Sequence, residues 1–441
     1  MRIAGVHILG CCMSLLLAGC GDQQAPASVK SETNREGAAA TGSTTVTLAY
    51  NRYLNLSFSE HPSPFAALQS YLEAHQPELT VSLSVLPDAS RGHRDALVVW
   101  LMAEDDAVDL YGIDAPWVPE FAQAGWAVPL GELVPELARD FLPAGLEAFS
   151  WQGQPVGVPF WGSIGGLYWR KDLLQEAGIV RPTTFSDLTN AVRKVLDRHP
   201  ELSGYLWPGG RNEALIQTWA EIFIGFGGRY FHADGRCAVN SPAGHRALNF
   251  MRDAPLSGIS PREVVVWNAE EARQRFVSGE AVFLRHNQDL LSWLDDTNRS
   301  RVAGKWAFGP NPAGPAGRSA SVTGGFAFVL NPYSRNREAA VRVLRALASE
   351  EVQRAFGLAW GPVQYHRRVY EDPGVRAVNA HLDQLAAVLP DAVARPASSD
   401  YAQLSDILQR EIHAALTGQK PVAEALDQAC IEIDALGKRK P

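Results

Sequence analysis

Cysteine and excess positive charge are both scarce in this sequence. Only 5 of the 441 residues are cysteine, and 40 basic residues face 48 acidic ones, for a net charge of −8. This acidic balance argues against a general binder of phosphate backbones, which would carry a basic surplus. Apolar residues at 46% and charged residues at 20% exclude low-complexity, collagen-like and wholly disordered chains. The length exceeds one compact core and predicts two or three domains.

Recognisable catalytic motifs are also missing. The sequence has no G-x-S-x-G elbow, no P-loop, no H-E-x-x-H and no C-x-x-C. His61, His75 and His93 lack the spacing of metal ligands on one helix face. The acidic pairs Asp105-Asp106 and Asp295-Asp296 are adjacent in loop-like contexts, so no glycosidase dyad can be identified. We therefore expect no catalysis, no cofactor and no metal site.

The N-terminus reads as an export signal. Arg2 precedes an apolar stretch from Ile8 to Ala18, which is the length of a signal-peptide core and too short to span a bilayer. Leu17-Ala18-Gly19-Cys20 resembles a bacterial lipobox, in which Cys20 becomes the lipid-modified first residue of the mature chain. We expect a signal peptide over residues 1–19 and a membrane anchor at Cys20. An ordinary secretory signal that happens to contain cysteines is the alternative.

A polar, small-residue segment follows, and we expect residues 20–45 to form a flexible tether. With the signal removed and Cys20 lipidated, Cys237 and Cys430 are the only internal cysteines. An exported chain meets an oxidising compartment, so these two residues either form a disulfide or remain as separate thiols. The sequence does not give the distance between them.

Alternating strand and helix patterns begin at Val46. We expect a strand with apolar residues at Val46, Leu48 and Tyr50, a helix that starts at Ser63-Pro64, strands at 81–85 and 109–113, and a helix at 117–124. A second region of alternating strands and helices runs from Val156 to Arg285 and contains a capping box at Thr184 and Asp187. A further strand is expected at 324–331. This order predicts an α/β fold of two lobes separated by a cleft, with mainly parallel sheets and ligands at strand C-termini.

Several segments, in order, resemble the extracellular solute-binding proteins of bacterial ABC sugar importers. They are Asp109–Leu130, Gly153–Gly178 with Pro182–Phe185, Trp267–Arg285, Gly324–Phe356 and Arg395–Gly418. The resemblance runs from about residue 46 to 435 and is closest to the disaccharide-binding branch, which includes trehalose/maltose-binding proteins.

The resemblance implies a two-lobe, periplasmic-binding-protein-like clamshell of type II with hinge strands. The expected first lobe comprises 46–158 and 323–361, and the second 159–322 and 362–441. The chain would cross between lobes near Val158, Ser321 and Pro362. A bound solute would select the closed state. ABC permease subunits would recognise that state. We expect a monomer, lipid-anchored and facing the periplasm or exterior, with no nucleic-acid partner.

Candidate ligand residues follow from the same resemblance. Asp114 stands where the family presents an acid to sugar hydroxyls, and Trp161 stands at its cleft aromatic, where a sugar face would stack. Gly325 precedes Phe326, which replaces a frequent tryptophan, and Arg395 matches the family's cleft arginine.

Other candidates carry alternatives or departures. Trp117 either contacts ligand or packs its own helix. Ser163 stands where close disaccharide binders carry aspartate, so a strong acceptor has been lost. Asn287 and Asp289 stand where this branch usually shows tryptophan and tyrosine, which suggests a solute smaller or more polar than a disaccharide.

Trp207 or Trp293 would be substitute stacking platforms, and Arg211 and Glu213 either contact ligand or form surface salt bridges. Together these residues suit a neutral polyhydroxylated solute, a sugar (a disaccharide among them) or a polyol, and the resemblance implies a binding protein that captures it for an ABC importer. The alternatives are a receptor that presents its solute to a membrane sensor and, in a different class, a secreted carbohydrate-active enzyme.

Overall fold

The computed structural model describes residues 43–57, 60–88, 90–292, 294–361, 365–378 and 381–437. The expected signal peptide, the anchor at Cys20 and most of the expected tether lie outside the described residues. Strand β1 (Thr44–Asn51) begins two residues before Val46. The last two residues of the expected tether, Thr44 and Thr45, therefore belong to a strand. No helix among the described residues is long and apolar enough to cross a membrane.

The first lobe is built on three parallel-paired strands. β1 lies between β2 (Leu79–Leu86) and β3 (Leu110–Asp114), parallel to both. Helix α1 (Pro64–His75) starts where the sequence predicted, because the Ser63 side chain accepts a hydrogen bond from the Ala66 amide and Pro64 occupies the first turn. The other elements of this lobe before the first hinge strand are η1 (Arg52–Asn55), α2 (Ser90–Met102), η2 (Ala115–Trp117), α3 (Val118–Gln123), α4 (Glu136–Asp140), α5 (Pro143–Ala148), β4 (Ser150–Trp151) and β5 (Gln154–Pro155).

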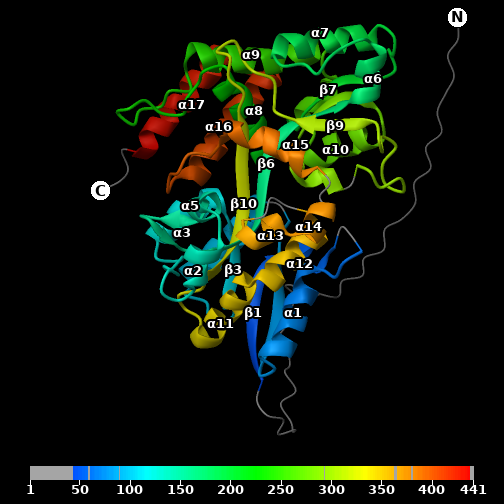
Figure 1. The fold of residues 1–441 in the computed structure, drawn as a ribbon. Helices are drawn as coiled ribbons and strands as arrows, with labels where there is room; N and C mark the ends of the chain where they lie inside the picture. Colours follow the sequence, from blue (N-terminus) through cyan, green and yellow to red (C-terminus); the bar gives the residue numbers. More distant parts are fainter. Residues whose placement is uncertain are drawn as a thin grey trace, which may run out of the picture. The chain divides into compact units, whose positions relative to one another are not determined.

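Two long strands pass from one lobe into the other through the centre of the fold (Figure 1). β6 (Val158–Arg170) and β10 (Ser321–Leu330) pair antiparallel with each other. The first-lobe end of β10 pairs with β3, and the second-lobe end of β6 pairs with β8 (Ala281–Asn287), both antiparallel. The sheet order is β2-β1-β3-β10-β6-β8-β7. The sheet is therefore mixed, and the expectation of mainly parallel sheets is wrong, because β10 runs against β3 and β6, and β6 runs against β8.

The second lobe packs its helices around the far end of these strands. Helix α7 (Phe185–Leu196) carries the predicted capping box between Thr184 and Asp187, and its apolar stripe is buried. The remaining elements of this lobe are α6 (Lys171–Glu176), β7 (Ser203–Leu206), α8 (Glu213–Gly225), α9 (Pro242–Leu256), η3 (Arg262–Val266), α10 (Ala269–Val277), η4 (Gln288–Ser292), β9 (Trp306–Gly309), α15 (Leu382–Val388), η5 (Leu389–Asp391), β11 (Ala392–Val393), α16 (Tyr401–Leu416) and α17 (Val422–Gly437).

Beyond β10 the chain returns to the first lobe. Helices α11 (Arg337–Ala348) and α12 (Glu350–Trp360) pack against α1. The expected crossing at Pro362 lies outside the described residues. The short helices that follow, α13 (Arg367–Glu371) and α14 (Pro373–Val378), still contact α12, whereas α15 contacts β9. The change of packing partner thus falls later in the chain than Pro362, between α14 and α15.

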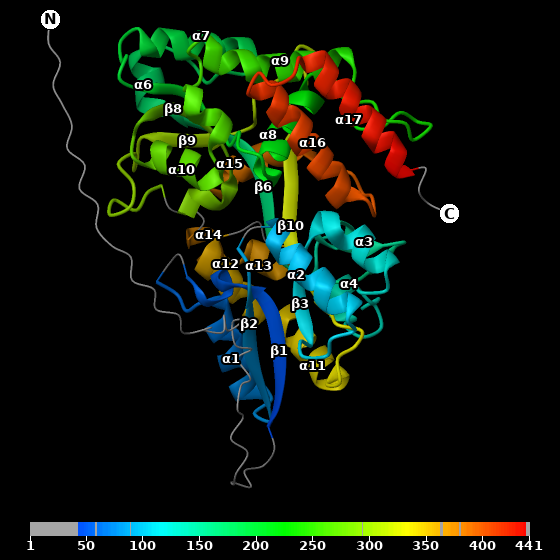
Figure 2. The same cartoon turned by 180° about the vertical axis from the view of Figure 1, so that it is seen from behind.

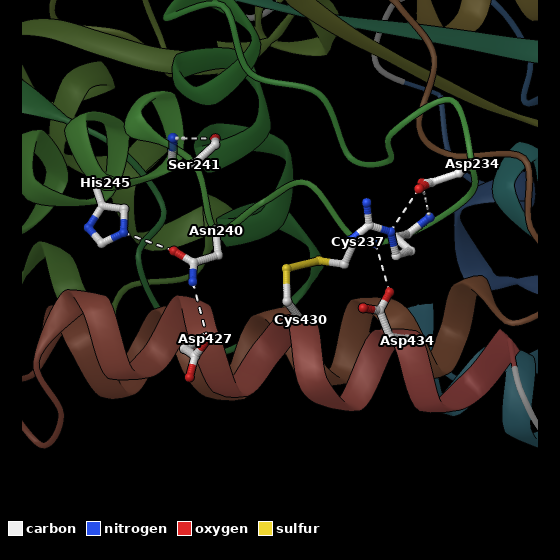
Figure 3. The surroundings of a disulfide bond; sticks show 10 residues. Asp234, Cys237, Asn240, Ser241, His245, Asp427, Cys430 and Asp434 are labelled. Atoms are coloured by element: carbon white, nitrogen blue, oxygen red, sulfur yellow. Dashed lines mark hydrogen bonds and ion pairs between the residues drawn. A yellow bond between two sulfur atoms is a disulfide. The ribbon is translucent and has the colours of Figure 1, made fainter.

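A disulfide joins Cys237 to Cys430 on α17, with their Cα atoms 5.2 Å apart (Figure 3). The neighbouring Asp434 carboxylate accepts a hydrogen bond of 2.7 Å from the Cys237 amide. Asn240 donates to Asp427 one turn before the cysteine, at 3.3 Å. The two internal cysteines therefore form a bridge, and polar contacts on both sides of it hold α17 to the segment 237–240.

Candidate functional site

Charged side chains from both lobes meet at Arg395. Its Nη2 donates to Asp114 Oδ1 at 2.9 Å, and its Nη1 donates to Glu213 Oε1 at 3.0 Å. Asp114 ends β3 in the first lobe, whereas Glu213 opens α8 in the second. Glu213 also accepts hydrogen bonds from the hydroxyls of Tyr401 and Ser405. Asp114 and Arg395 are thus brought together, and Glu213 joins them in an internal ion-pair network.

Burial governs the electrostatics of this network. The Arg395 and Asp114 side chains are 3% and 9% exposed. Burial raises the pKa of Asp114 and the charge of Glu213 adds to the rise, while the Arg395 guanidinium opposes it. Burial alone would lower the pKa of Arg395, yet Asp114, Tyr401 and Glu213 together raise it above its usual value. Arg395 stays charged, and two carboxylates already occupy its fork.

Phe326 on β10 lies at the centre of a group of aromatic side chains, to which β6 contributes Trp161. The Trp161 ring stacks on it at 5.7 Å between centroids, and Trp117 meets it edge-on at 6.2 Å. Trp161 and Phe326 are half-buried, whereas Trp117 is 4% exposed and packs on His93 and Phe121. Trp117 therefore packs within the first lobe and also lines the cavity described below, whereas Trp161 and Phe326 form a half-buried ring pair on the hinge strands.

Gly325 sets the geometry of this stack. Its φ is 151°, and a Cβ atom there would lie 2.3 Å from the Trp161 carbonyl oxygen. The pairing register of β6 and β10 shifts directly afterwards, between Phe326 and Ala327. Ser163 lies on β6 opposite Gly324 and is buried. The hinge therefore requires glycine at position 325, because its backbone conformation and its close approach to Trp161 leave no room for a side chain.

The segment 287–289 follows β8 beside the hinge. Asn287 pairs with Gly165, and its half-buried side chain leaves Oδ1 without a hydrogen-bond partner among the described residues. Asp289 lies 3.5 Å from His286; burial would raise the pKa of Asp289, but His286 lowers it below its usual value. Between them, Gln288 bonds to β6 through its side chain. Sequence reasoning missed Gln288, since no motif marks a side chain that pairs with a strand.

The aromatic substitutes proposed for this segment do not both reach the site. Trp207 is 1% exposed and donates from its indole N–H to Ser260 Oγ at 3.1 Å. It is a core residue, so its proposed stacking role is wrong. Trp293 lies outside the described residues.

A cavity of about 1050 Å³ opens between elements of the two lobes. Its lining combines α2 and Trp117 from the first lobe with the ends of α8, α10, α16 and α17 from the second, and Figure 2 shows α2, α16 and α17 on the same side of the hinge strands. Arg211 and Glu213 line it, and Trp161, Asn287 and Asp289 do not. At its edge, Arg91 and Arg211 from opposite lobes contact Asp406 at 3.0 and 3.3 Å. This volume is at the upper end of ordinary ligand pockets.

Comparison with known proteins identifies the class to which this architecture belongs. Residues 59–354 match the family model of bacterial extracellular solute-binding proteins. A probable ABC transporter-binding protein of Deinococcus radiodurans is 28% identical over 79% of this chain and 84% of its own length. The mannitol-binding protein of Pseudomonas aeruginosa is 25% identical over 66% of each chain. Maltose-bound MalE3 of T. maritima superimposes with a TM-score of 0.81 and 28% identity over 89% of this chain and 99% of that one.

The match covers most of the folded chain, so the protein belongs to the bacterial extracellular solute-binding protein family. Its fold is the two-lobe clamshell of that family. It is a binding protein and not an enzyme.

Proposed function

We propose that this protein captures a neutral sugar or polyol and delivers it to an ABC importer, from a lipid anchor at Cys20. The observation that carries the proposal is the half-buried Trp161–Phe326 stack on the hinge strands, beside polar groups from both lobes. Aromatic faces pack against the C–H faces of sugars, and flanking polar groups orient the hydroxyls. The maltose bound to MalE3 and the mannitol named for the Pseudomonas relative support this class of solute.

A ligand screen by thermal shift tests the solute class. The panel contains maltose and other mono-, di- and oligosaccharides, mannitol and other polyols, and amino acids, peptides and metal ions as the contrasting set. A ligand at about 100 times its dissociation constant adds roughly 2.7 kcal/mol of stability. Stabilisation by a sugar or polyol supports the proposal, whereas stabilisation by the contrasting set alone refutes it.

The proposed stacking face is tested with a matched pair of tryptophan variants. Trp161→Ala should weaken binding of the hit from the panel at least tenfold, because it removes one ring of the half-buried stack. Trp100→Ala removes another half-buried tryptophan, which lies on α2 rather than on a hinge strand, and should leave the affinity unchanged. Equal affinities for the two variants would refute the site.

The anchor is tested separately. Cys20→Ala removes the proposed acylation site and should give a protein that no longer partitions into detergent or incorporates labelled acyl chains. Normal acyl labelling of that variant would refute the lipobox assignment. Uptake of the labelled solute by cells should fall when the gene is deleted, and unchanged uptake with altered gene expression would favour a sensing role over import.

A further inference from the structure

Within the described part of the chain, one stretch of hinge strand β6 lacks a strand partner on one edge. From Gly162 to Ile164, β6 pairs with β10 on one side, whereas its pairing with β8 on the other side begins only at Gly165 opposite Asn287. Backbone groups of residues two apart point toward the same edge of a strand. The Gly162 carbonyl and the Ile164 amide therefore face the space just beyond the end of β8.

The Gln288 side chain fills this position. The Ile164 amide donates to Gln288 Oε1 at 2.7 Å, and Gln288 Nε2 donates to the Gly162 carbonyl at 2.8 Å. A glutamine amide carries the same acceptor and donor as a peptide unit, so it extends the β8 ladder by one side-chain rung. Gln288 is 1% exposed, and removing its amide would leave both backbone groups buried without these partners.

The place of Gln288 in the chain links the hinge to the candidate ligand residues. Asn287 and Asp289 flank it, and the backbone groups that it binds flank Ser163 on the strand that crosses between lobes. We propose that Gln288 is a positioning residue that fastens the segment 287–289 to the hinge strand, so that movement of the hinge and movement of this segment occur together. An effect of Gln288 on solute affinity rests on the proposed function, whereas its coupling of the segment 287–289 to the hinge strand does not.

Gln353 provides a matched control in the first lobe. It is also 1% exposed, and its Nε2 donates to the Pro159 carbonyl on β6 at 3.0 Å and to the Leu347 carbonyl at 2.8 Å. It binds the same strand without touching the segment 287–289. A general loss of packing should therefore affect Gln288→Met and Gln353→Met alike, whereas a coupling role should distinguish them.

Two ligand-free measurements on the full chain test the link. Hydrogen exchange read by mass spectrometry reports on a peptide that includes residues 162–165. Spin labels at Met102 and Val180, which are 73% and 88% exposed on the first and second lobes, report the interlobe distance. Gln288→Met should speed exchange of that peptide at least tenfold and broaden the distance distribution. Gln353→Met should leave the distance distribution as in the wild type.

Gln288→Glu tests the same bonds if the methionine variant folds poorly. A charged carboxylate still accepts from the Ile164 amide but repels the Gly162 carbonyl, whereas a protonated carboxyl can donate to it. The distance distribution of this variant should be broad at pH 8, where the carboxyl is charged. A distribution as narrow as that of the wild type at pH 8 would overturn the proposal.

The solute measurement keeps the two proposals distinguishable. Gln288→Met should weaken the panel hit at least tenfold, and Gln353→Met should not. If no sugar or polyol binds the wild type, the proposed function fails while exchange and distance still decide the role of Gln288. Wild-type exchange and distances in Gln288→Met, or equal changes in both methionine variants, would overturn the coupling role.

Discussion

His93 should make the free energy of unfolding fall as the pH is lowered. It lies on α2, is 1% exposed, and its Nε2 is 2.9 Å from the Gly112 carbonyl on β3. Its ring packs on Tyr50 and on Trp117, with centroids 5.6 and 5.5 Å away. Burial lowers the pKa of His93 from 6.5 to about 4, although the contact with Gly112 opposes the change. The folded protein therefore holds this imidazole neutral.

The direction and size of the effect follow from linkage. Because the folded pKa lies below the unfolded one, the unfolded chain takes up the proton first as the pH falls. The free energy of unfolding is thus highest above pH 6.5 and falls as the pH approaches 4. At about 1.36 kcal/mol per pH unit, the loss over this interval is about 3 kcal/mol. That is a large share of the roughly 5–15 kcal/mol that stabilises a typical domain.

The assay compares urea unfolding of the wild type and His93→Gln at pH 7.5 and pH 4.0. The wild type should lose about 3 kcal/mol more than the variant between these pH values. Burial also lowers the pKa of His366 and of His381, but these residues contribute equally to both proteins and cancel in the comparison. Equal acid sensitivity of the two proteins would refute the reasoning.

Three further perturbations test the disulfide, the hinge and the ion-pair network. Cys430→Ser opens a loop spanning a sequence separation of 193 residues and should cost up to about 5 kcal/mol in urea unfolding; reductant should destabilise the wild type but not this variant. Gly325→Ala should cost about 1–3 kcal/mol, because its Cβ would meet a carbonyl oxygen at 2.3 Å; wild-type stability would contradict the geometry. Arg395→Ala leaves Asp114 and Glu213 without their shared cation and should cost about 3–5 kcal/mol, whereas an exposed-arginine control, Arg335→Ala, should cost under about 1 kcal/mol.

Local sequence rules predicted the parts of the fold that depend on near neighbours. Ser63 and Thr184 begin helices because their side chains satisfy backbone amides within three residues. The direction of pairing in the sheet was not predictable this way. β6 and β10 meet across more than 150 residues of sequence, as the pairing of Gly162 with Gly325 shows. Only the tertiary fold reveals that these two strands run against each other and against β3 and β8, which makes the sheet mixed.

The family resemblance predicted which side chains gather near the hinge but not what each one does there. Arg395 with Asp114, and Trp161 with Phe326, do come together. The sequence could not distinguish Trp117 from the stacking residues, because an aromatic residue after a strand is compatible with both helix packing and ligand contact. Gln288 gave no signal at all, since its role depends on a gap in strand pairing that only the three-dimensional register defines.

From their exposure and existing bonds, we propose that the candidate residues form a supporting group and a contacting group. Asp114, Ser163 and Arg395 are buried, and the two charged residues already neutralise each other within the network. Trp161 and Asn287 are half-buried side chains, and the Asn287 amide oxygen is itself buried without a hydrogen-bond partner among the described residues. An anionic solute would need an unpaired cation, yet two carboxylates hold Arg395. A solute without charge, bound through its apolar face and its hydroxyl donors, meets the groups that remain, which is why the balance of charge inside the network favours a neutral sugar or polyol.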